Sequence, residues 1–309
     1  MIISNLLRFF AGCLSAWYPN SQISINKDIK LRKYILNKLK KIHKNNNNLQ
    51  KTHKIFNKKI INLLHDKNLR NFLRKNFIQK MFFLQNRLFI YQELKELKKL
   101  KKWSFYKNLL IEDSIGNPIR YFLYLKSSGN KINHVYHLSV LENELKIKLK
   151  KRIKKVFEFG GGYGCMARIF SKINNNIKYT CFDTIYVNLL QYYYLSHNNL
   201  NVGFEKNKKF FLSSKLENTK EKNDLFIANW SLSETPIQFR NKFYFKISNS
   251  KYIFICFQEK FENIDNLKYF NNLKNKLRNK FDIKIINNRF YKGNFIFKQN
   301  HYFLIGKKL

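Results

Sequence analysis

A cluster of glycines directly after a short apolar run constrains the fold of this chain more than any other feature. Residues 155–159 lead into Gly160-Gly161-Gly162-Tyr163-Gly164, and a helical pattern follows. Four of these five positions are glycine, although the whole chain of 309 residues holds only 10 glycines. A strand that turns through glycines into a helix lets a ligand approach the backbone, because no side chain blocks it. The sequence therefore predicts a ligand site at this turn.

Short apolar runs alternate with amphipathic stretches throughout the second half of the chain. Buried strands separated by helices are typical of βαβ units and a parallel sheet covered on both faces. We therefore predict an open α/β sandwich with strands at residues 156–159, 179–182, 225–228, 252–257, 281–286 and 302–305.

The first half has a different pattern. Apolar residues recur at three- and four-residue steps between positions 29 and 103, which predicts helices, with a solvated loop at 45–48. A turn at 116–118 precedes a short predicted strand at 119–125, a polar loop at 127–133 and a helix at 134–150. We expect a basic helical region over residues 1–115 and a second domain, which contains the glycine turn, over 116–309.

The charge of the chain is strongly positive. Lys and Arg number 60 against 19 Asp and Glu, a net charge of +41, of which +27 lies before Val156 and +14 after it. Such a charge first suggests a polyanion such as nucleic acid or an anionic membrane surface. An AT-rich coding sequence would also favour Lys, Asn, Ile, Phe and Tyr, so the charge alone defines no reaction.

Cysteine use and hydropathy indicate a reducing compartment. Cys13, Cys165, Cys181 and Cys256 are widely spaced and form no zinc-ligand pattern, so we expect free thiols. Residues 1–17 favour a first amphipathic helix over an export signal, because Arg8 interrupts the longest apolar run. No segment approaches the roughly 18 to 20 apolar residues of a membrane span. The expected location is the cytoplasm, with peripheral attraction to the inner membrane face.

The spacing of the glycines indicates which ligand the turn binds. A dinucleotide site reads G-x-G-x-x-G, but Cys165 stands where its third glycine belongs, and no Gly-Lys-Ser/Thr follows for a Walker A loop. Glu158, Gly160, Gly162 and Gly164 instead form an acidic residue followed by G-x-G-x-G. S-adenosylmethionine carries an amino acid and a sulfonium cation, so an acidic neighbour favours it over NAD.

Two further polar positions follow predicted strands. Asp183 ends the second strand, where a carboxylate can accept hydrogen bonds from the ribose hydroxyls of a bound adenosine. The alternative for Asp183 is an N-cap of the helix that begins near Ile185. The loop at 229–236 follows the fourth strand and is expected to face the donor and the acceptor, although Ser233 or Thr235 could equally cap the next helix.

These residues resemble the sugar O-methyltransferase family, a branch of the class I S-adenosylmethionine-dependent methyltransferases. The resemblance rests on residues 157–164, Asp183, the aromatic run 190–195, and the later segments 230–234, 257–258 and 301–306, with 134–138 ahead of the first strand. It covers about residue 116 to the C-terminus; Thr184 departs from it, since the family commonly has a leucine-proline step there. The resemblance implies a Rossmann-like class I methyltransferase sandwich with a mostly parallel seven-stranded sheet. It also implies binding of S-adenosyl-L-methionine by Glu158, Gly160, Gly161, Gly162, Tyr163, Gly164, Asp183, Asn229 and Trp230, and of a sugar or glycan acceptor by Ser231, Ser233, Gln258 and His134.

Methyl transfer to a hydroxyl requires alignment of the two reactants and removal of a proton. We assign the general base to His137, with Glu234 and then His301 as the competing candidates. The sequence shows no adjacent carboxylates for a hard cation, so no metal is expected. An RNA ribose methyltransferase and a non-catalytic donor-binding module remain open as alternatives, with nucleic acid the less favoured partner.

Overall fold

The computed structural model describes Leu6, Phe10, Leu14 and residues 24–43, 51–82, 86–216, 222–290 and 299–309, with only the backbone for 43 and 51–55. The loop predicted at 45–48 lies outside these ranges. So does the helix predicted for residues 1–17, except for Leu6, Phe10 and Leu14. The chain forms two compact units. Unit 1 comprises residues 1–136, 162–168 and 184–202, and unit 2 comprises residues 137–161, 169–183 and 203–309. The domain boundary predicted at residue 116 stays a prediction.

Unit 1 is mainly helical, as the periodicity of residues 29–103 predicts. In α5 (Leu88–Lys99), Ile90, Leu94 and Leu97 are fully buried at three- and four-residue steps, so one face of the helix joins the core. The other elements of the first 128 residues are α2 (Ile25–His43), α3 (Lys51–His65), η1 (Leu69–Arg74), α4 (Asn76–Met81), α6 (Trp103–Leu109) and the hairpin of β1 (Arg120–Tyr121) and β2 (Tyr124–Ser128).

The polar loop predicted at 127–133 is wrong, because β2 continues to Ser128 and α7 (Gly129–Glu144) begins at once. Lys131 and Asn133 on this segment are fully buried, so their polar character does not indicate solvent exposure. The helix predicted at 134–150 correspondingly ends early, at Glu144, and a separate short helix, α8 (Leu149–Arg152), follows.

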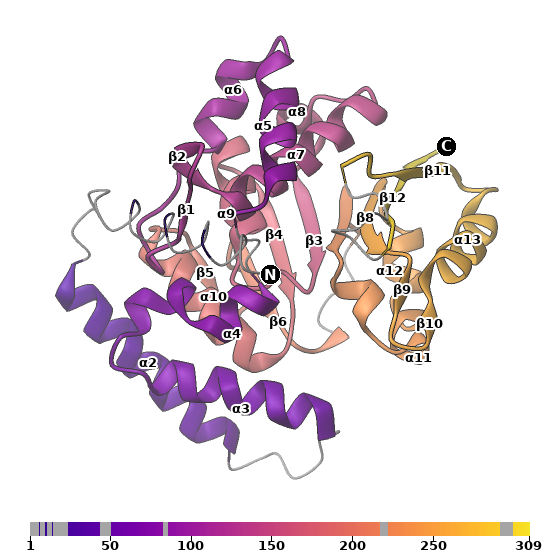
Figure 1. Cartoon of the computed structure of the whole chain (residues 1–309). Helices are drawn as coiled ribbons and strands as arrows, with labels where there is room; N and C mark the ends of the chain where they lie inside the picture. Colours follow the sequence, from indigo (N-terminus) through magenta and orange to yellow (C-terminus); the bar gives the residue numbers. More distant parts are fainter. Residues whose placement is uncertain are drawn as a thin grey trace. The chain divides into compact units, whose positions relative to one another are not determined.

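Unit 2 contains the central sheet. The predicted strands are confirmed as β3 (Lys155–Phe159), β4 (Lys178–Phe182), β7 (Leu225–Asn229), β8 (Tyr252–Gln258), β11 (Phe281–Asn287) and β12 (His301–Lys308). The described residues form eight strands in this sheet rather than seven, because β6 (Phe210–Ser213) is joined by the two-residue β5 (Val202–Gly203). Their order is β11-β12-β8-β7-β3-β4-β6-β5 (Figure 1).

The strand order identifies the fold class. β3 pairs in parallel with both β4 and β7, β4 with β6, and β7 with β8, which is the order of doubly wound nucleotide-binding sheets. Near one edge, β12 runs antiparallel between β8 and β11. This is the predicted Rossmann-like α/β sandwich with a mostly parallel sheet. The order reverses between β3 and β7, and ligands bind beyond the carboxyl ends of the strands at such a point.

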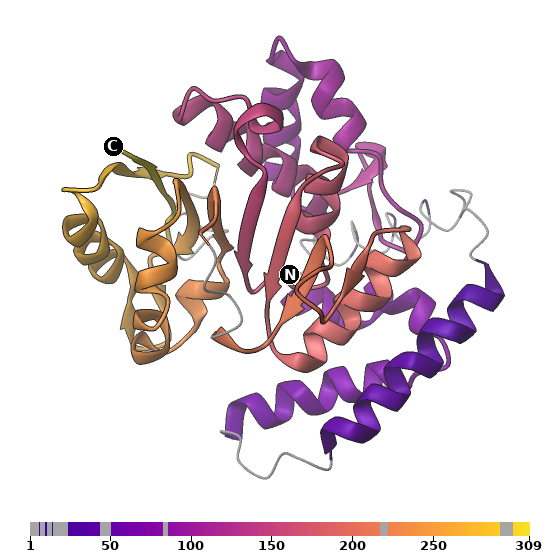
Figure 2. The same ribbon diagram turned by 180° about the vertical axis from the view of Figure 1, so that it is seen from behind.

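An aromatic core fills one face of the sheet in unit 2. Phe157 stacks on Phe226 with ring centroids 5.6 Å apart, and Phe243 packs edge-on to Phe159 at 4.7 Å. The helices α11 (Ile237–Asn241), α12 (Tyr244–Ser248) and α13 (Asn266–Leu277) belong to this unit, and α13 packs against β8 and β11 (Figures 1 and 2). The hairpin of β9 (Lys260–Phe261) and β10 (Ile264–Asp265) follows β8. The core thus holds the ends of β3 and β7 in a fixed register.

Candidate functional site

A buried carboxylate lies at the end of β3. Glu158 is 3% exposed and, because side chains alternate along a strand, it faces away from Phe157 and Phe159. Its Oε2 has no hydrogen-bond partner among the described residues. Burial raises the pKa of Glu158 to about 8, and the neighbouring Tyr179 hydroxyl offsets only part of this shift. Glu158 is therefore a buried acid that a cationic group would convert to its charged form.

The glycine turn adopts the backbone conformation that its composition predicts. Gly160, Gly162 and Gly164 have φ angles of 67°, 55° and 97°, a region that residues with a Cβ seldom adopt. Gly160 is also closed to a side chain, because a Cβ there would lie 2.2 Å from the Cβ of Ser231. The Ser231 hydroxyl donates a 2.5 Å hydrogen bond to the carbonyl of Phe159. The ends of β3 and β7 are thus joined at the point where the strand order reverses.

Asp183 follows β4 at the same edge of the sheet. The amide of Gly160 donates to the carbonyl of Phe182 over 2.8 Å, and the amide of Asp183 donates to the carbonyl of Ser213 over 3.1 Å. The alternative role as an N-cap is not observed, since Thr184 is the N-cap of α10 (Ile185–His197) and accepts from the amide of Val187. Asp183 is therefore fixed through its backbone without a capping role.

The loop after β7 is held by β8 and β12. Trp230 has a positive φ of 60°, which is uncommon for a residue other than glycine, and its amide donates to the carbonyl of Cys256 over 2.8 Å. Its indole Nε1 donates to Nδ1 of His301 over 3.0 Å. A ring nitrogen that accepts this bond is unprotonated, so the neutral His301 carries its proton on Nε2. Burial lowers the pKa of His301 to about 4, and the ring is therefore neutral near pH 7.

His137 is fully buried beneath this loop. Its ring packs edge-on against Trp230 and Phe303, with centroids 5.3 and 5.1 Å apart, and its Nδ1 lies 3.6 Å from Sγ of Cys256. The same sulfur lies 3.0 Å from Oδ1 of Asn229. These contacts connect His137 to the ends of β7, β8 and β12 and give it an evident packing role.

Ser233, Glu234 and Gln258 meet at the next turn, which is the 3₁₀ helix η3 (Ser231–Glu234). The Ser233 hydroxyl lies 2.8 Å from Oε1 of Gln258, and the Gln258 amide donates to Glu234 over 3.4 Å. Glu234 is exposed, whereas Ser233 and Gln258 are buried. The next helix, α11, has Pro236 at its N-cap position and no side-chain cap. The alternative role of Ser233 or Thr235 as the cap of this helix is therefore not observed.

A buried arginine fixes this turn. Arg240 is 0% exposed and donates to the carbonyls of Ser233 and Thr235 over 2.5 and 2.6 Å, and to Oδ1 of Asn266 over 2.7 Å. Its three hydrogen-bond acceptors are neutral. The sequence reasoning missed Arg240, since a basic residue in an amphipathic pattern reads as exposed.

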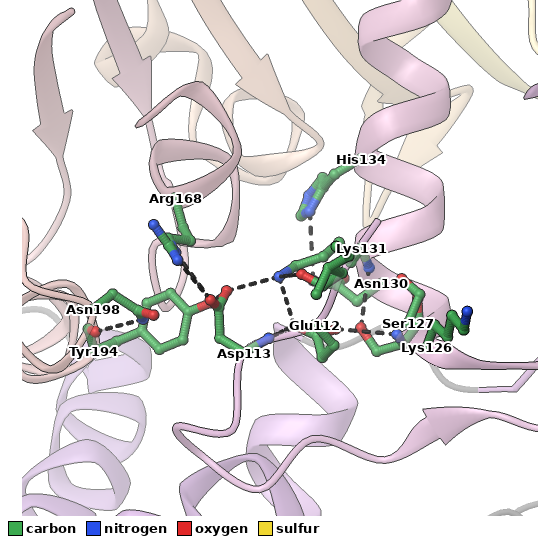
Figure 3. Close-up of polar contacts among 12 residues, drawn as sticks. Glu112, Asp113, Lys126, Ser127, Asn130, Lys131, His134, Arg168, Tyr194 and Asn198 are labelled. Carbon is green, nitrogen blue, oxygen red and sulfur yellow. Dashed lines mark hydrogen bonds and ion pairs between the residues drawn. The ribbon is translucent and has the colours of Figure 1, made fainter. Parts of the chain in front are cut away.

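Two predicted site residues, His134 and Tyr163, belong to unit 1 and join a polar cluster there. Figure 3 shows His134 beside Asn130 and Lys131. Asn130 connects His134 with Tyr163, because its amide lies 3.5 Å from Nδ1 of His134 and donates to the Tyr163 hydroxyl over 3.1 Å. Burial lowers the pKa of His134 to about 4, so His134 is neutral near pH 7.

The centre of this cluster is a set of ion pairs that the sequence reasoning did not find (Figure 3). Lys131, fully buried, lies 2.8 Å from both Glu112 and Asp113, and Arg168 lies 2.9 Å from Asp113. Burial opposes the charge of Lys131, but Asp113 and Glu112 raise its pKa above the ordinary value. Two cations and two anions balance here, so the cluster is internally neutralised.

No group of three or more His, Cys, Asp or Glu side chains in the described residues is placed to hold a metal ion. Cys165, Cys181 and Cys256 are buried free thiols, as predicted, and Cys13 lies outside the described residues. No helix in the described part of the chain combines the length and the hydropathy of a membrane span. Unit 2 contains most of the predicted site residues, whereas Gly162, Tyr163, Gly164 and His134 belong to unit 1. Those of unit 2 are Glu158, Gly160, Gly161, Asp183, Asn229, Trp230, Ser231, Ser233, Glu234, Gln258, His137 and His301.

The chain matches no protein-family model, and no curated protein matches it. Solved structures of methyltransferases are similar to it in fold at low identity. The methyltransferase domain of bacterial CtHen1 is 11% identical, covers 54% of this chain and 96% of its own, and has a TM-score of 0.39. The 16S rRNA methylase ArmA is 15% identical, and the match covers 70% of this chain and 98% of ArmA with a TM-score of 0.35. Phosphoethanolamine N-methyltransferase 2 of Haemonchus contortus is 12% identical, and the match covers 71% of this chain and 59% of that protein with a TM-score of 0.40. That structure is a complex with phosphomonomethylethanolamine and S-adenosylhomocysteine.

Proposed function

We propose that this chain is an S-adenosylmethionine-dependent methyltransferase that binds its donor at the carboxyl ends of β3, β4 and β7. The observation that carries this proposal is Glu158, a buried carboxyl with no partner for Oε2 among the described residues, directly before the glycine turn. A buried carboxylate without a cation is costly, so a ligand that brings a positive charge to this point gains from pairing with it.

The chemistry of the site fits this donor better than it fits a dinucleotide. The amino-acid part of S-adenosylmethionine carries an ammonium group, whereas the pyrophosphate of NAD would place negative charge beside Glu158. Asp183 stands at the end of the neighbouring strand, where its carboxylate accepts hydrogen bonds from ribose hydroxyls. When bound, S-adenosylmethionine supplies a methyl group that its sulfonium makes electrophilic.

The protein must also remove a proton when a hydroxyl is methylated, and Glu234 fits this task best. Glu234 lies on η3, close to the carboxyl ends of β7 and β8, and Gln258 orients its carboxylate through a hydrogen bond. Burial of this carboxyl group raises its pKa, which makes it a stronger base. His301 has its Nδ1 engaged by Trp230 and a pKa near 4, which makes it a weak base and a good Nε2–H donor. His137 stays a candidate, but its complete burial against Trp230 and Phe303 favours a positioning role.

The proposed acceptor is a sugar hydroxyl, in a glycan or polysaccharide precursor. The support is the resemblance of residues 230–234, 257–258 and 301–306 to sugar O-methyltransferases. An RNA ribose hydroxyl is the second candidate, because the net charge of +41 attracts polyanions. The same proton-removing chemistry serves both acceptors.

One experiment tests the donor and the acceptor separately. The full chain is incubated with S-adenosylmethionine and a panel of free sugars, nucleotide-linked sugars, glycans and structured RNA, and methylated product is followed by mass spectrometry. We expect transfer to a sugar hydroxyl, which Glu158→Gln abolishes. Transfer to RNA alone would replace the sugar proposal, and donor binding without any transfer would indicate a non-catalytic binding module.

A further inference from the structure

The helix α2 has two distinct faces, and the inner face is occupied by α10. Tyr34 packs on Tyr192 with ring centroids 4.6 Å apart, and Ile35 and Leu39 are fully buried. Asp28, the single acidic residue of α2, accepts a hydrogen bond from the Tyr193 hydroxyl and lies 3.3 Å from Nε2 of His197. The acid of this helix is therefore turned towards the protein.

The outer face of α2 forms a groove with an apolar floor and a cationic rim. Ile29 and Leu36 provide the floor, and Arg32, Lys33 and Lys40 provide the rim. Asn37 and His65, the last residue of α3, complete the lining of this groove, whose volume is about 450 Å³. In both views α2 and α3 lie side by side as two long helices (Figures 1 and 2). No acidic side chain lines the groove in the described part of the chain.

We propose that this outer face of α2 docks on the surface of an anionic phospholipid bilayer. Three of the seven Lys and Arg residues of α2, namely Arg32, Lys33 and Lys40, line this groove without an acidic residue among the described lining residues, so the face carries a concentrated positive charge. Ile25 and Ile29 are 70% and 59% exposed and project apolar surface between the lysines. Lysines beside apolar side chains suit a bilayer surface, because their stems lie along the acyl boundary while the ammonium groups reach the lipid phosphates.

The chemistry of the groove favours a bilayer over a nucleic acid. Proteins that bind single-stranded nucleic acid stack its bases on aromatic rings. The floor of this groove is aliphatic instead, and no Phe, Tyr or Trp is among its described lining residues. Leu6, Phe10 and Leu14 recur at four-residue steps in the same unit and are each about half exposed. Unit 1 thus presents apolar side chains together with positive charge, the combination that interfacial helices use. This inference does not depend on the methyl-transfer proposal.

Vesicle co-sedimentation of the full chain tests the inference. We expect binding to phosphatidylcholine vesicles that contain phosphatidylglycerol, weak binding to phosphatidylcholine alone, and release as the salt is raised from about 0.1 M towards 1 M. The double variant Lys33→Glu/Lys40→Glu reverses two exposed charges of the groove and should weaken binding by on the order of thirtyfold or more. Ile29→Ser should weaken it about threefold or more without any change in charge.

A matched control separates the groove from the general charge of the chain. Lys276→Glu/Lys280→Glu changes the net charge equally at exposed positions of unit 2, and we expect its vesicle affinity to fall far less. Thermal unfolding verifies that every variant is folded. Equal losses in both double variants, or an unaffected Ile29→Ser, would overturn the proposal, because either result indicates diffuse charge attraction. So would tighter binding of an RNA oligonucleotide that depends on Lys33 and Lys40 and displaces the vesicles.

Discussion

A Cβ atom on Gly160 would lie 2.2 Å from the Cβ of Ser231. No methyl group therefore fits between the backbone of Gly160, at the end of β3, and the side chain of Ser231, which follows β7. Ser231 also donates its hydroxyl to the carbonyl of Phe159. The two strand ends on either side of the reversal in strand order are thereby held together. The close approach explains why glycine is required at this position in addition to its positive φ.

We expect Gly160→Ala to destabilise the fold by about 1 to 3 kcal/mol, because the methyl group both overpacks against Ser231 and strains the backbone. Donor affinity should fall as well, since the turn must shift. Urea unfolding and calorimetric titration measure the two effects. Gly306→Ala is the matched control: a Cβ there meets Ile283 at 3.4 Å, an ordinary contact, so a cost near that of Gly160→Ala would contradict this account.

Glu158→Gln is expected to stabilise the free protein at neutral pH. The pKa of Glu158 is raised to about 8 in the folded chain, against an ordinary value of 4.5. The folded state therefore holds a proton that the unfolded state releases, and stability is lost as the pH rises from about 4.5 to about 8. At pH 7 this ionisation costs the folded state about 3 kcal/mol. Urea unfolding between pH 5 and 8 should show a flatter pH dependence for Glu158→Gln.

Glu93 provides the control for that result. Burial likewise raises its pKa to about 8, but its Oε1 accepts a hydrogen bond from Asn133 over 2.8 Å in unit 1. Glu93→Gln should flatten the stability profile in the same direction and leave donor affinity unchanged. A loss of donor binding in both variants would point to general disruption of the fold instead of a role for Glu158.

Arg240 should be essential for the turn that carries Ser233 and Glu234. Arg240→Met keeps the length of the side chain but leaves the carbonyls of Ser233 and Thr235 without their donor, which we expect to cost about 2 to 3 kcal/mol. Lys242→Met, an exposed neighbour, should change stability by less than about 0.5 kcal/mol. Equal effects of the two variants in urea unfolding would show that the hydrogen bonds of Arg240 do not hold this turn.

Glu234 and His137 are distinguished by kinetics. With the acceptor found in the panel, Glu234→Gln should lower kcat by about 10² to 10⁴ without changing the donor Kd, as expected for a general base. His137→Gln should lower the unfolding midpoint more than it lowers kcat, because the ring packs among Trp230, Phe254 and Phe303. The opposite pattern would restore His137 as the base.

Much of the sheet could be predicted from the sequence because its central strands are buried on both faces and read as continuous apolar runs. β8, whose seven residues are all buried, is the clearest case. β5 has only two residues, and β6 has four that follow a run of lysines, so neither stands out from its surroundings. The glycine turn and Asp183 were found because special backbone conformations and strand ends leave a local signature.

The buried charges could not be predicted, since their partners lie far away in the sequence. Lys131 is paired with Glu112 and Asp113, and Arg240 is enclosed by carbonyls, yet each looks like a solvated residue in a local pattern. The predicted loop at 127–133 failed for this reason. Burial of a charge depends on tertiary pairing, which periodicity does not record.

Calorimetric titration of the full chain with S-adenosylmethionine tests the central claim most directly. At pH 7 the free protein holds a proton on Glu158, so binding of the ammonium group should release about 0.9 proton, measured by comparing buffers of different ionisation enthalpy. Glu158→Gln should bind more weakly and release none. Binding of NAD in place of S-adenosylmethionine, or donor binding that Glu158→Gln leaves unchanged, would contradict the account.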